Sequence, residues 1–187
     1  MEARPCPISE FLNGTKQMLI PLFQRPYEWS TREWEVLWDD VLEQYENGDE
    51  SASPSHFTGA IVTAPAKSVP IGVSKFLVID GQQRLTTVSM IICAIRSLIP
   101  KTTAQYRKLT KLLINEDDED LDYYKLLPTQ SDRPAFQAPR QRGGSRGLAI
   151  LSSVREMARF ARKFDTQRIQ RRTFEFAIFR KAASSCG

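Results

Sequence analysis

Histidine and cysteine are scarce in this sequence of 187 residues, and their scarcity narrows the possible chemistry. The three cysteines, Cys6, Cys93 and Cys186, are odd in number and far apart, so they form neither a CxxC metal pair nor a disulfide framework. One histidine, His56, is too few for a structural zinc site or an HNH-type nuclease centre. We therefore expect a protein with reduced thiols and no nuclease site of its own.

Two longer patterns are missing as well. No apolar run approaches the roughly 18–20 residues needed to cross a bilayer, and the polar N-terminus has no secretory h-region. These absences predict a cytoplasmic protein. No segment matches GxxxxGKS or GxxxxGKT, so a P-loop is excluded.

Charge is divided unevenly along the chain. Residues 1–137 hold 14 Lys or Arg against 19 Asp or Glu, a net −5, whereas residues 138–187 hold 12 against 3, a net +9. An Arg- and Gly-rich linker, residues 139–147, stands near this boundary. We predict a first domain over 1–137 and an atypical basic tail over 138–187, possible origins being a truncated or frame-shifted gene. The tail fits either a polyanion-binding segment or a solvated helical surface.

Hydrophobic periodicity predicts alternating helices and strands. The clearest helix carries an apolar stripe from Trp34 to Tyr45 and starts with a capping box of Ser30 and Glu33. The other expected elements are a short helix over 8–12, an edge strand or extended entry segment over 18–23, strands over 57–62 and 76–79, and helices from 81 and over 103–114. A short polar turn or helix is expected between Pro128 and Pro134, followed by weak helices over 148–164 and 166–179.

The sharpest chemical signal is the junction where the apolar strand meets the apolar helix, at Asp80-Gly81-Gln82-Gln83-Arg84. A helix N-terminus attracts anions through its free N–H groups and its dipole. Gly81 would let a phosphate approach the backbone, Gln82 and Gln83 could donate hydrogen bonds, and Arg84 offers a planar charged fork. Asp80 suits a Mg²⁺ ion that touches the phosphate. The same residues also fit a capping box of Asp80 and Gln83 that needs no ligand.

Two further segments contain candidate binding groups. Gln24 and Arg25 lie in the proline-restrained stretch 20–29, which could present an Arg and aromatic side chains to a nucleotide. Alternatively, this stretch is an apolar staple that leads into the Trp34 helix. His56 precedes a predicted strand, and a lone histidine is more often a structural residue than a catalyst.

Taken together, these motifs resemble the N-terminal domain of GmrSD-type restriction enzymes, which belongs to the ParB/sulfiredoxin-like group. The resemblance covers about residues 8–100 and continues more weakly through 126–136. The motifs that carry it are Ile20-Pro21-x-Phe23-Gln24-Arg25-x-Tyr27-x-Trp29, then Trp34, Leu37 and Asp39-Asp40, then His56-Phe57-x-Gly59, and finally Val78-Ile79-Asp80-Gly81-Gln82-Gln83-Arg84-Leu85-Thr86-Thr87.

The resemblance implies an α+β fold: a small mixed sheet of ParB/sulfiredoxin type with flanking helices and a helical C-terminal extension. It implies a bacterial phage-defence system in which this domain binds and hydrolyses NTPs with Mg²⁺ or another divalent metal. A separate HNH-type nuclease domain or subunit would then cut modified phage DNA. The alternatives are a switch module that holds a nucleotide or DNA without turnover, and an inactive fragment.

Site residues follow from the same resemblance. Asp80, Gln83 and Arg84 are expected to be catalytic, with Asp80 as the metal ligand. The nucleotide would be bound by Gly81, Gln82, Gln83 and Arg84 at the helix start, by Gln24 and Arg25 as a second wall, and by His56 as a neighbour.

Overall fold

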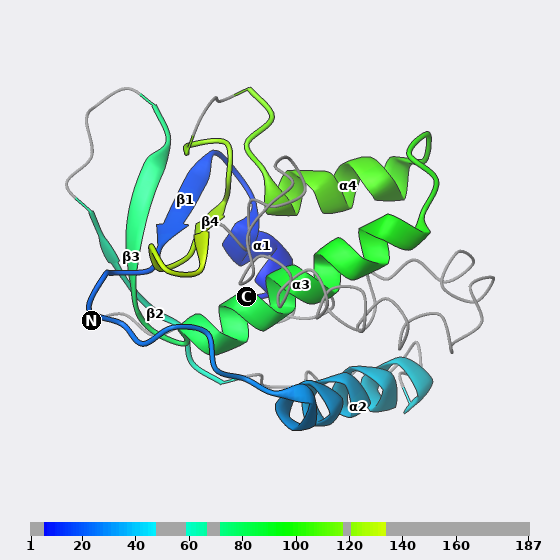
Figure 1. Cartoon of the computed structure of the whole chain (residues 1–187). Helices are drawn as coiled ribbons and strands as arrows, with labels where there is room; N and C mark the ends of the chain where they lie inside the picture. Colours follow the sequence, from blue (N-terminus) through cyan, green and yellow to red (C-terminus); the bar gives the residue numbers. More distant parts are fainter. Residues whose placement is uncertain (1–5, 48–58, 67–71, 118–120, 134–187) are drawn as a thin grey trace, which may run out of the picture.

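The protein folds around a small sheet, with one long apolar helix, α3, against it (Figure 1). The computed structural model describes residues 6–47, 59–66, 72–117 and 121–133. In chain order the elements are α1 (Ile8–Leu12), β1 (Lys16–Leu19), α2 (Thr31–Asn47), β2 (Val62–Pro65), β3 (Ser74–Asp80), α3 (Gln82–Leu98), α4 (Ala104–Leu113) and β4 (Leu126–Leu127).

The four strands form one mixed sheet in the order β2-β3-β1-β4. β1 runs parallel to both β3 and β4, and β2 is antiparallel to β3. The carboxyl ends of β3, β1 and β4 therefore meet at the same edge, where ligands of open sheets with parallel strands commonly bind. The small mixed sheet with its helices agrees with the mixed α/β architecture that we expected.

The sheet corrects two predictions and adds one strand. We expected an edge strand or extended entry segment over 18–23, but β1 lies inside the sheet, because Pro21 follows the strand and leaves its ladder intact; the N–H of Ile20 still donates to the carbonyl of Leu127 at 3.0 Å. β2 begins at Val62, later than the start of the strand predicted over 57–62. Leu126–Leu127, which precede the short turn or helix predicted between Pro128 and Pro134, form the additional strand β4.

Helix α3 supplies much of the core, as its pattern predicted. Leu85 and Ile92 have no measurable exposure, and neither has Val78 on β3, so the helix lies buried between the sheet and its neighbours. Trp34 and Leu37 of α2 belong to the same apolar cluster, as do residues of α4, which packs on α3. Burial of such apolar surface is the main contribution to the stability of the fold.

The helix starts follow from local chemistry. At α2, the carboxylate of Glu33 accepts hydrogen bonds from the backbone N–H of Ser30 at 2.7 Å and from its hydroxyl at 2.5 Å, which confirms the predicted pairing of these residues. At α4, the hydroxyl of Thr103 accepts the N–H of Tyr106 at 3.2 Å.

Residues 134–187, with the predicted tail and its two weak helices, lie outside the described residues. In the ranges that are described, no helix combines the length and apolarity that crossing a membrane requires.

Candidate functional site

The junction between β3 and α3 presents a helix start that no side chain caps. Gly81 is the N-cap residue, with φ 91° and ψ 11°, and the N–H of Leu85 donates to its carbonyl at 2.9 Å. The capping box of Asp80 and Gln83 that the sequence left open is therefore wrong, because the N-cap is one residue later and makes no side-chain bond. The N–H groups of the first turn, which cannot bond within the helix, remain available for an anion.

Glycine is required at position 81 for two separate reasons. Its positive φ belongs to the left-handed region that other residues adopt only at a cost. A Cβ at this position would also lie 3.0 Å from the carbonyl oxygen of Ala60 and 3.1 Å from the Cα of Ile61. The backbone that enters β2 thus lies directly against the start of α3.

Arg84 lies against the backbone of Gly59 and Ala60, the segment that precedes β2. Its Nη2 group donates to the carbonyl of Ala60 at 2.5 Å and lies 3.4 Å from the carboxylate of Asp80. A Cβ on Gly59 would lie 3.0 Å from Cζ and Nε of Arg84, so a larger residue at this position would require the Arg84 side chain to shift. Among the residues that the structure describes, the buried Nε atom has no hydrogen-bond partner, and the side chain as a whole is 31% exposed. Contact with this backbone fixes one side of the guanidinium, and part of the Arg84 side chain remains exposed to solvent.

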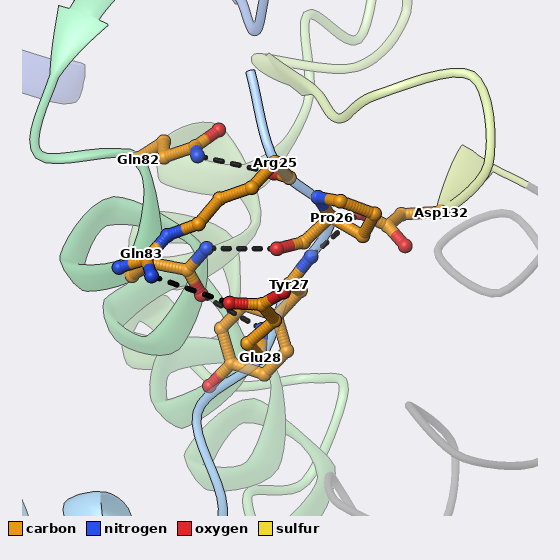
Figure 2. A network of polar contacts seen from close by, with 7 residues as sticks. All are labelled: Arg25, Pro26, Tyr27, Glu28, Gln82, Gln83 and Asp132. Atoms are coloured by element: carbon orange, nitrogen blue, oxygen red, sulfur yellow. Dashed lines mark hydrogen bonds and ion pairs between the residues drawn. The ribbon is translucent and has the colours of Figure 1, made fainter.

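Gln82 and Gln83 hold a second chain segment, residues 25–28, against the start of α3 (Figure 2). Nε2 of Gln82 donates to the carbonyl of Arg25 at 3.1 Å, and Nε2 of Gln83 donates to the carbonyl of Pro26 at 2.9 Å. Oε1 of Gln83 accepts the backbone N–H of Glu28 at 3.0 Å. Gln82 and Gln83 are buried, and each amide keeps one hydrogen beyond these bonds.

Two other contacts secure this segment at its ends. Nε2 of Gln24 donates to the carbonyl of Ile79 at 2.9 Å, next to the helix start. The carboxylate of Asp132 accepts the backbone N–H of Tyr27 at 3.0 Å (Figure 2). The same carboxylate accepts the hydroxyl of Thr129 at 2.7 Å. We did not predict a site-building role for Asp132; the signal in the sequence was the weaker part of the resemblance, over 126–136, which includes this residue.

The hydroxyl of Tyr27 belongs to a directed chain of hydrogen bonds. Thr87 donates its only hydroxyl hydrogen to the carbonyl of Gln83 at 2.8 Å. The 2.7 Å contact between Tyr27 and Thr87 must therefore be donated by Tyr27, which in turn accepts the indole N–H of Trp34 at 2.6 Å. Burial raises the pKa of Tyr27 to about 12, with the nearby Glu33 carboxylate as a minor further cause. The phenol is thus a neutral donor at physiological pH.

The structure brings together most of the expected site residues. Asp80, Gly81 and Arg84 lie at the start of α3, where Asp80 is exposed and Gly81 is buried, whereas Gln82 and Gln83 face the segment that contains Arg25 and Pro26. In that segment Arg25 is exposed and forms an ion pair with Glu28 at 3.2 Å (Figure 2). His56 lies outside the described residues. Within the described ranges, no group of three or more His, Cys, Asp or Glu side chains is placed to hold a metal.

Comparison with known proteins identifies the family. The family model for the GmrSD restriction endonuclease N-terminal domain matches residues 8–179. No curated protein matches the chain. The matched range extends past residue 137, where we expected the family-type domain to end. It contains all the motifs that suggested the resemblance, and it spans most of the sequence. The chain therefore belongs to the family of GmrSD restriction endonuclease N-terminal domains.

Proposed function

We propose that this domain binds nucleoside triphosphates with a divalent metal at the start of α3, and that it hydrolyses them. The observation that carries the proposal is Gly81, a left-handed N-cap without a side-chain capping bond, placed between Asp80 and Arg84. Family membership supports the setting, a DNA restriction system.

Phosphate binding would use the backbone first. The N–H groups of Gln82, Gln83 and Arg84 belong to the first turn of α3, where the helix dipole favours negative charge. Gly81 adopts the left-handed N-cap conformation that links β3 to α3, and a phosphate oxygen would accept hydrogen bonds from these N–H groups. Arg84 then adds a charge-assisted bond and would stabilise charge that develops on the transferred phosphoryl group.

Asp80 fits the role of a metal ligand. Its side chain is 69% exposed, and one carboxylate together with phosphate oxygens and waters is a common Mg²⁺ arrangement. When bound, the metal would neutralise charge on the phosphate oxygens. The Asp80–Arg84 pair is long and exposed, so its separation on nucleotide binding should cost little.

Gln82 and Gln83 would chiefly position the segment that contains Gln24 and Arg25, since their amides donate to the backbone carbonyls of Arg25 and Pro26. Gln83 keeps one amide hydrogen, and we assign it the attacking water, which is the role expected from the family. Gln24 and Arg25 would face the nucleotide from the opposite side, with His56 nearby.

We further propose that hydrolysis here regulates an HNH-type nuclease domain or subunit, which cuts modified phage DNA. The basic residues 138–187 would contact DNA without sequence preference, so that binding weakens steeply with salt.

The test is calorimetric titration with ATP, GTP, CTP and UTP plus Mg²⁺, combined with a phosphate-release assay. We expect wild type and the exposed control Arg107→Ala to bind and hydrolyse, whereas Asp80→Asn should bind nucleotide and release no phosphate. Absence of binding to any triphosphate would reject the proposal. Binding without release by wild type would reject hydrolysis and favour a switch module.

A further inference from the structure

Exposed apolar side chains gather beside the helix start. Among the described residues, five large apolar side chains are exposed, and three of them stand where β1 and β3 end: Leu22 is 71% exposed, Phe23 80% and Ile79 44%. The other two, Val36 and Leu121, lie on α2 and in the loop before β4. Large apolar groups that cluster in the open commonly mark a binding surface.

The apolar rim, defined as Leu22, Phe23 and Ile79, is held in place by backbone contacts. The register of the adjacent parallel strands β1 and β3 places Leu19 opposite Leu77; β1 ends there, whereas β3 continues through Ile79 to Asp80. The N–H of Gln24 closes a turn on the carbonyl of Pro21 at 3.1 Å. The side chain of Gln24 then bonds the carbonyl of Ile79 at 2.9 Å. The rim is therefore fixed next to Asp80 and does not depend on a long free loop.

We propose that the rim receives the base of the bound nucleotide, with Phe23 as its stacking surface. This inference rests on the proposed function, because it takes the phosphates to lie at Gly81 and Arg84. A ligand that suits an apolar surface beside a cation and a helix N-terminus has an anionic end and a flat, weakly hydrated face. A nucleotide has both. Every base offers a π-face, so a stacking contact discriminates weakly among bases.

The decisive comparison is between ATP and inorganic tripolyphosphate, both with Mg²⁺, because tripolyphosphate has the anionic end and lacks the base. Phe23→Ala should weaken ATP binding by about 5- to 150-fold, the range that loss of one stacked base implies, and change tripolyphosphate binding less than twofold. Phe23→Trp should retain ATP affinity, since it keeps an aromatic face. Val36→Ala, which removes an exposed apolar group elsewhere, should change neither affinity.

Each outcome of this titration decides the matter. Unchanged ATP affinity in Phe23→Ala, with tripolyphosphate still bound, overturns the base contact and leaves the phosphate site intact. Equal losses for both ligands also overturn it, because Phe23 would then support the site or the fold; thermal unfolding of the variant separates these two cases. If wild type binds neither ligand, the proposed function fails and this inference fails with it.

Discussion

Gln83 and Glu28 are joined by a 3.0 Å hydrogen bond in which the side-chain oxygen of Gln83 accepts the backbone N–H of Glu28. The nitrogen of the same amide donates to the carbonyl of Pro26, so this one side chain of α3 bonds to the backbone on both sides of Tyr27. Residues 55 positions apart in sequence are thereby locked at the start of the helix. The candidate site thus consists of the N-terminus of α3 and the segment 25–28, which side chains of α3 hold in place.

Replacement of Gln83 by Leu should destabilise the protein. Two part-buried hydrogen bonds, to the carbonyl of Pro26 and the N–H of Glu28, would be lost, and each typically contributes about 0.5–1.5 kcal/mol. Urea unfolding measures the loss, and the exposed Gln105→Ala serves as a control that should unfold like wild type. A Gln83→Leu variant with full stability and no hydrolysis would show that Gln83 serves the chemistry alone.

Two glycines with similar backbone conformation separate strain from steric exclusion. Gly81 and Gly14 have φ values of 91° and 80°, yet of these two only Gly81 has neighbours within 4 Å of the position that a Cβ would occupy. Gly14→Ala should therefore cost about 1 kcal/mol for the backbone alone, and Gly81→Ala clearly more, on the order of 2–4 kcal/mol. Unfolding midpoints compare the two. Equal losses would mean that the approach of Ala60 to Gly81 does not restrict the site.

Gly59 offers a way to disturb Arg84 without replacing it. A Cβ there would lie 3.0 Å from the guanidinium carbon, so Gly59→Ala should displace the guanidinium and lower triphosphate affinity several-fold. Gly72→Ala is the matched control, because Gly72 also has a positive φ and nothing within 4 Å. Titration with Mg²⁺-ATP distinguishes them. The same affinity in both variants would argue that the position of Arg84 is unimportant.

The sequence predicted the parts of this site that are local and missed those that depend on distant contacts. An apolar strand followed by glycine and an apolar helix is a local pattern, and α3 begins at Gln82 as expected. The anchoring role of Asp132 depends on a partner 105 residues away. The two-residue strand β4 has too few residues to show periodicity, and only its neighbour β1 defines it. Likewise, Gln82 and Gln83 looked like ligand donors because their backbone partners in the second wall could not be seen in the sequence.

Tyr27 should make stability depend on alkaline pH. Its pKa is raised from 10.0 to about 12 by burial, so the folded state favours the neutral phenol. The corresponding stabilisation is fully present below pH 10 and is lost as the pH rises toward 12, about 2–3 kcal/mol in total. Tyr27→Phe cannot ionise there, so urea unfolding at a series of pH values should show wild type losing stability relative to this variant above pH 10. If the stabilities of wild type and Tyr27→Phe changed in parallel with pH, the result would contradict a buried, neutral Tyr27.

The central claim is that Arg84 and the uncapped start of α3 bind the phosphates of a nucleotide. Its most direct test is calorimetric titration of wild type, Arg84→Lys and Arg84→Ala with Mg²⁺-ATP, with thermal unfolding to verify the fold. Loss of a charge-assisted bond should weaken binding by about 10- to 100-fold in Arg84→Ala, and Arg84→Lys should fall between, because lysine keeps the charge and loses the planar fork. Equal affinity in wild type and Arg84→Ala would contradict the claim and leave the junction as a structural helix start.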